Sequence, residues 1–68
     1  MIDKMYQTTE NYFESLLQNY NNSDKNFISY SLIFGLMKGY YDCLEHYFGE
    51  EKDLRKLYNS YVIKLKEA

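Results

Sequence analysis

The stretch from residue 25 to residue 48 carries more apolar side chains than one neighbouring helix could cover. At about 100° per residue, its apolar positions spread over about 200° of a helical wheel. The arc consists of Tyr30, Leu32, Ile33, Phe34, Leu36, Met37, Tyr40, Tyr41, Cys43, Leu44, Tyr47 and Phe48. We therefore expect this stretch to be a central helix that contacts other helices on at least two sides.

Two amphipathic stretches flank this central segment. Residues 3–20 repeat apolar side chains at spacings of three and four and keep the opposite face polar, which predicts a first helix. Residues 50–66 follow the same pattern and end in lysines, which suit the negative end of a helix dipole. Because the chain also has no proline, we expect an all-α, three-helix array with helices at about 3–20, 25–48 and 50–66.

The ends of the central helix are marked by turn-forming residues. The Asn, Ser and Asp side chains of residues 21–25 favour a loop, with Ser23 or Asp24 as the cap of the next helix. Gly49 stands where a C-cap glycine belongs. The apolar spacing nevertheless continues through Gly49, and one glycine costs only about 1 kcal/mol inside a helix. A continuous helix over 25–66 is therefore the alternative.

The length of the chain limits how stable it can be alone. Its 68 residues form a single helical domain, 1–68, and domains of this size usually need a disulfide, a metal or association with another chain. Cys43 is the only cysteine and His46 the only histidine, so neither an internal disulfide nor the usual zinc site is available. We expect no metal and no cofactor, and we expect self-association to complete a homodimeric helical bundle.

Four small residues recur at every fourth position of the central helix. They are Ser31, Gly35, Gly39 and Cys43. Two glycines inside a helix cost about 2 kcal/mol of helix propensity together, so a compensating contact would explain them. We expect this row to let another helix approach closely, within the chain or between two copies. The alternative places the glycines in solvent or under a tyrosine.

Aromatic residues are unusually frequent, with nine tyrosines and four phenylalanines. Tyrosine is common at interfaces because an apolar ring carries a polar tip, although a bias toward AT-rich codons explains the same composition. Tyr41 lies about 100° round the helix from Tyr40, so Tyr40, Tyr41 and Tyr47 cannot all face one neighbour. We expect part of this cluster to bind a partner; the alternative is that all three belong to the core.

These features favour a non-enzymatic function. Cys43 and His46 are not spaced as a nucleophile and its base, and the chain has no glycine-rich phosphate loop. We expect a small protein–protein interaction protein, a regulator or inhibitor whose partner is another protein of unknown identity. The small size and AT-rich composition suit a phage or another mobile element, including anti-defence proteins.

The alternative function is that of a small helical DNA-binding transcriptional regulator. The basic residues gather in the third predicted helix, beside the acidic Glu50, Glu51 and Asp53. They are Lys52, Arg55, Lys56, Lys64 and Lys66. The net charge of −2 gives no polybasic footprint, so nucleic acid is the less favoured partner.

The sequence also carries expectations about location. Its first residues lack the basic start and apolar run of a signal peptide. The longest mainly apolar run, 27–41, is too short to span a membrane. We therefore expect a cytoplasmic protein without a membrane partner.

Overall fold

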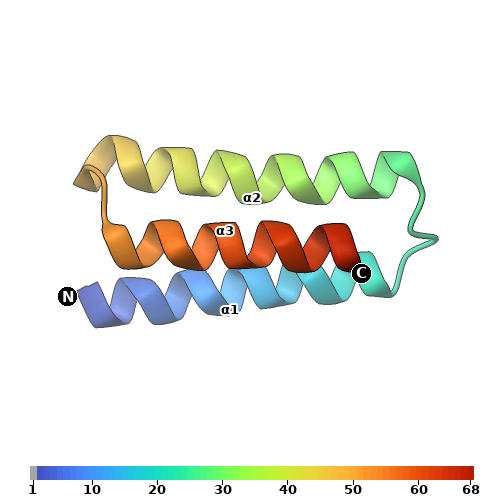
Figure 1. Cartoon of the computed structure of the whole chain (residues 1–68), viewed down its shortest axis with the longest axis horizontal. Coiled ribbons are helices and arrows are strands. Elements are labelled where there is room, and N and C mark those ends of the chain that lie inside the picture. The colour runs from blue at the N-terminus through green and yellow to red at the C-terminus, as the bar shows by residue number, and fades with distance from the viewer. Residues whose placement is uncertain (1) are drawn as a thin grey trace.

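The computed structural model describes residues 2–68, which form three α-helices that run up, down and up (Figure 1). They are α1 (Ile2–Asn21), α2 (Phe27–Phe48) and α3 (Lys52–Glu67). Each helix packs against both of the others, so the predicted all-α, three-helix array is confirmed over these residues. Met1, the first residue of the predicted domain, lies outside the described residues.

The core lies along the line where the three helices meet. Each helix buries one stripe of residues spaced by three or four, which is the spacing that places side chains on one face. The buried residues are Thr9, Phe13, Leu16 and Tyr20 of α1, Ile33, Met37 and Tyr41 of α2, and Leu54, Leu57, Tyr61 and Leu65 of α3. Phe13 links all three helices, because its ring centroid lies 5.8 Å from that of Tyr40 and 5.7 Å from that of Tyr61.

The residue that caps the N-terminus of α2 is not one of the two that the sequence predicted. Asn26, and not Ser23 or Asp24, caps this helix, because its Oδ1 accepts a hydrogen bond from the Ser29 N–H at 2.8 Å. Ser23 instead donates its hydroxyl to the Tyr20 carbonyl at 2.6 Å and closes the end of α1. The central helix therefore begins at Phe27, two residues later than the predicted start.

Gly49 ends α2, so the alternative of one continuous helix over 25–66 is wrong. Its φ of 77° is a conformation that side-chain-bearing residues rarely adopt, and its N–H donates to the Glu45 carbonyl at 2.9 Å. Glu51 then caps α3 by accepting a hydrogen bond from the Asp53 N–H at 3.4 Å. This short connection lets α3 turn back along α2 (Figure 1).

Candidate interaction surface

The side of α2 that points away from the core carries exposed aliphatic side chains. Ile28 is 76% exposed, Leu32 62% and Leu36 41%. These three residues lie one helical turn apart and form a continuous row, which we call the aliphatic row. Large exposed apolar patches on proteins are typical of surfaces that bind a partner, which makes this row a candidate interaction surface.

A second row, which consists of residues with small side chains or none, runs beside the aliphatic row. Ser31, Gly35, Gly39 and Cys43 are all exposed, and we call them the small-residue row. A Cβ atom placed on Gly35 or Gly39 would meet nothing within 4 Å. Neither α1 nor α3 therefore makes the close approach that the sequence allowed within the chain. A contact between two copies stays a prediction.

Large aromatic residues stand at both ends of the small-residue row. Phe27 and Tyr47 continue the same spacing of four residues and are 82% and 80% exposed. Phe48, beside Tyr47, is 57% exposed. The Tyr47 ring contacts only His46 among the aromatic side chains described, edge to face at 5.5 Å. The C-terminal end of α2 therefore presents two aromatic rings to solvent.

The three tyrosines predicted to bind a partner occupy different environments. Tyr41 is buried and stacks on Tyr58 of α3, with ring centroids 4.6 Å apart. Tyr40 is half-buried and packs against Tyr12 of α1 at 4.7 Å. Of the three, only Tyr47 offers most of its side chain to a second molecule.

Two core tyrosines hold their hydroxyls against carboxylates. Tyr61 donates to Glu14 Oε2 at 2.7 Å, and Tyr41 donates to Glu45 Oε2 at 3.2 Å. Burial, followed by the hydrogen bond to the carboxylate, raises the pKa of Tyr61 well above its usual range and raises that of Tyr41 as well. Both hydroxyls therefore act as hydrogen-bond donors that join core tyrosines to carboxylates.

Some of the charged residues on the surface are paired within the chain. Lys38 and Asp42 form an ion pair at 2.9 Å at the edge of the small-residue row, and this hydrogen bond raises the pKa of Lys38. On α3, Arg55 pairs with Glu50, and the Lys64 ammonium lies 4.4 Å from the centre of the Tyr61 ring. Two of the five cations that suggested a DNA-binding face are thus engaged within the chain.

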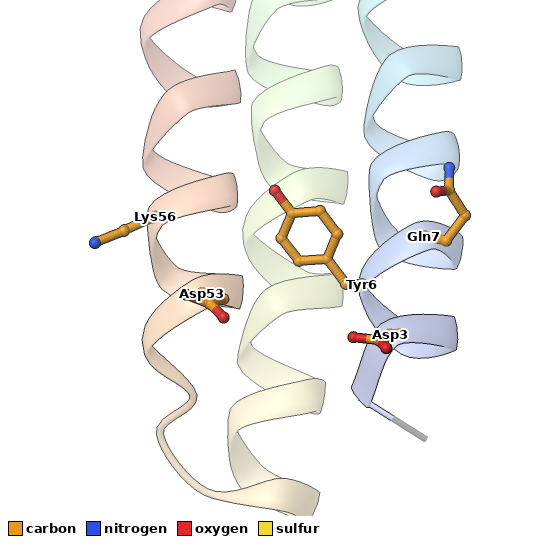
Figure 2. Close-up of a pocket in the computed structure, with 5 residues that line it drawn as sticks. All are labelled: Asp3, Tyr6, Gln7, Asp53 and Lys56. Atoms are coloured by element: carbon orange, nitrogen blue, oxygen red, sulfur yellow. The ribbon is translucent and has the colours of Figure 1, made fainter.

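Two open hollows lie between the helices. The larger, about 470 Å³, is lined by Asp3, Tyr6 and Gln7 of α1 and by Asp53 and Lys56 of α3. The Tyr6 ring extends into the space between the two helices, whereas Lys56 turns away from it (Figure 2). The smaller, about 260 Å³, lies between α1 and α2 and reaches Leu32 and Leu36. Both are open to solvent, unlike the enclosed sites that bury most of a small ligand.

Comparison of the chain with protein-family models, with curated proteins and with solved structures finds no match. Over residues 2–68, none of the helices has both the length and the apolar character needed to cross a bilayer. The same residues contain no group of three or more His, Cys, Asp or Glu side chains arranged to hold a metal ion.

The aliphatic row is the feature that the sequence pattern locates least well. Leu32 and Leu36 fall within the predicted apolar arc, part of which was expected to stay uncovered or to lie at an interface, but the partner-binding prediction named tyrosines and not these leucines. Ile28 lies outside that arc, next to the polar loop. The signal that could have found the row is the width of the arc, because two neighbouring helices of one small chain leave part of a 22-residue central helix uncovered.

Proposed function

We propose that this chain is a small non-enzymatic protein–protein interaction protein, a regulator or inhibitor that self-associates and binds another protein. The exposed apolar side chains of α2 carry the proposal. They are Phe27, Ile28, Leu32, Leu36, Tyr47 and Phe48. Burying one such side chain fully contributes about 1.5–3 kcal/mol, so a second protein that covers several of them gains substantial free energy.

The proposal divides these residues between two interactions. The aliphatic row runs along the N-terminal half of α2, which suits the homodimeric bundle expected from the size of the chain. Tyr47 and Phe48 lie at one end of α2 and suit a different protein, because exposed tyrosines are frequent binding hot spots. A cytoplasmic location and a phage or mobile-element origin are parts of the same proposal, supported by the composition.

The partner interaction is tested by capture from cells that naturally make the protein. We expect Tyr47→Ala to lose a defined co-purifying protein while its melting temperature stays close to that of the wild type, because the side chain is 80% exposed. Ile63→Ala is the matched control, since Ile63 is an exposed apolar residue on α3. Loss of the partner by both variants, or by neither, would reject the aromatic end of α2 as the binding site.

The same preparation tests the DNA-binding alternative. Lys52, Lys56, Lys64 and Lys66 are the exposed cations of α3 that make no ion pair among the described residues, and of these only Lys64 lies against an aromatic ring. A phosphate-binding surface would show retention on DNA that falls steeply as salt is raised. We expect retention to be weak and nearly independent of salt. A steep dependence, abolished by Lys56→Gln, would favour the transcriptional regulator instead.

A further inference from the structure

We propose that the outward face of α2 binds the same face of a second copy, with the two α2 helices parallel about a two-fold axis. In this arrangement the aliphatic row of each copy lies over the small-residue row of the other. The inference rests on the self-association proposed above and specifies its surface, its orientation and its residue pairs.

The two rows lie next to each other along the helix. Residues i and i+3 are neighbours on adjacent rows, so Leu32 lies beside Gly35 and Leu36 beside Gly39 within one chain. Each leucine projects from the surface, and the glycine three residues later, about 4.5 Å further along the axis, leaves open space. The face therefore consists of a ridge and a furrow of equal spacing, side by side.

The two-fold symmetry of a homodimer decides which rows can meet. An axis that runs along two parallel helices exchanges the left and right sides of the face and keeps each residue at its own height. Leu32 therefore meets the small-residue row of the other copy between Ser31 and Gly35. Leu36 meets the same row between Gly35 and Gly39. An axis across two antiparallel helices leaves each row opposite its own copy, so leucines would meet leucines and the glycines would enclose a gap. Rows spaced by four residues pack at a crossing angle near −50°. Only the parallel pair fills the furrow.

The surface of the chain is large enough for the smallest specific interfaces. Stable interfaces bury about 600–1,000 Å² of each partner and specific ones at least about 500 Å², and one-tenth of the 4807 Å² surface of this chain is close to that lower bound. α2 contains 22 of the 68 residues, and only Ile33, Met37 and Tyr41 of this helix are buried. Most residues of α2 therefore stay accessible to a second copy.

Charge does not oppose the pairing of two identical faces. The aliphatic and small-residue rows contain no ionisable side chain except the thiol of Cys43. The nearest charges along the small-residue row are Lys38 and Asp42, which neutralise each other at 2.9 Å. Like charges are therefore not brought together when the face meets its own copy, whereas a strongly charged partner would find nothing to pair with.

The surface is tested by sedimentation equilibrium of the wild type, Gly39→Leu, Leu32→Glu and the control Gln18→Leu, which adds a leucine on an exposed site of α1. We expect the wild type and Gln18→Leu to dimerise equally. Gly39→Leu adds a large side chain to the small-residue row, and Leu32→Glu adds a charge to the aliphatic row. Each variant should raise the dimer dissociation constant at least about tenfold. Circular dichroism should show unchanged helicity for both interface variants, because these positions are exposed in the single chain. A wild type that stays at 8.3 kDa overturns the inference and the proposed self-association together.

The orientation is tested separately by pulsed electron paramagnetic resonance on His46→Cys/Cys43→Ser, spin-labelled at residue 46. His46 lies ten residues from Leu36, so parallel helices crossing near that residue place the two labelled positions about 15 Å apart, and antiparallel helices place them about 30 Å apart. A short distance supports the parallel pair. A dimer with the long distance, or a Gly39→Leu variant that dimerises as tightly as the wild type, overturns the residue pairing but leaves self-association standing. The partner test at Tyr47 is independent of both results.

Discussion

The inner and outer faces of α2 both carry apolar side chains, but only those on the inner face are covered by the other two helices. Ile33, Met37 and Tyr41 on the inner face are at most 7% exposed, whereas Ile28, Leu32 and Leu36 on the outer face are 41–76% exposed. Residues 2–68 supply only two other helices, and neither covers the outer face of α2. The difference shows that this helix carries more apolar surface than its own fold can use, which is the basis of the proposed dimer.

The largest expected difference between the two faces is in the free energy of unfolding that is lost when one side chain on each face is truncated. Met37→Ala should lower the free energy of unfolding by about 2–5 kcal/mol, because it leaves a cavity at a fully buried site. Leu32→Ala should change it by less than about 0.5 kcal/mol in dilute solution, where the copies are apart. Urea unfolding at low protein concentration measures both. Equal losses would mean that Leu32 is covered within the single chain.

Buried and exposed tyrosine hydroxyls should also differ in their contribution to the free energy of unfolding. Tyr61→Phe should cost about 1.5–3 kcal/mol, because it removes a hydrogen bond to the Glu14 carboxylate at a site that is 4% exposed. Tyr47→Phe should be nearly neutral, since its hydroxyl lies in solvent. Chemical unfolding of the two variants beside the wild type gives the comparison. A neutral Tyr61→Phe would show that the link between α1 and α3 is made by the ring alone.

Alkaline pH should weaken the core through Tyr61, which lies on α3. Burial raises the pKa of Tyr61 in the folded chain, so the neutral hydroxyl is favoured there. The neutral Tyr61 hydroxyl contributes its full share of the free energy of unfolding below the ordinary tyrosine pKa. This contribution is lost as pH rises toward the pKa of Tyr61 in the folded chain, by about 1 kcal/mol at about pH 11. Melting temperatures between about pH 8 and about pH 11 should therefore fall less for Tyr61→Phe than for the wild type. Parallel curves would contradict this cause.

The smallest expected effect is a gain on the outer face. Gly35→Ala and Gly39→Ala should each stabilise the single chain by up to about 1 kcal/mol, because alanine has the higher helix propensity and the added methyl group meets open space. Thermal melts in dilute solution measure this gain. A lower melting temperature for either variant would mean that another part of the same chain contacts the small-residue row.

The sequence predicted the helices better than their environments. Apolar spacing and Gly49 located the three segments and the break before α3, because these depend on local backbone preferences. The first cap was assigned to Ser23 or Asp24 and is Asn26, since several neighbouring polar residues can cap equally well from sequence alone.

The surface was only partly predictable for a different reason. A helical wheel fixes the angles between Tyr40, Tyr41 and Tyr47, but it does not say which direction the neighbouring helices occupy. That direction depends on how Phe13, Tyr58 and Tyr61 pack together, with Tyr58 stacked on Tyr41. The width of the apolar arc nevertheless indicated that one side of α2 would need a further partner, which stays a prediction.

The hydrogen bond between Tyr61 and Glu14 joins positions 47 residues apart, and Leu65, beyond it, is 1% exposed. While the chain is being synthesised, α1 and α2 therefore have no third helix to complete their core until residues up to Leu65 have left the ribosome. A nascent chain of the first two helices exposes the inner and outer faces of α2 at once. Its stable fold is reached after translation of α3 and not helix by helix.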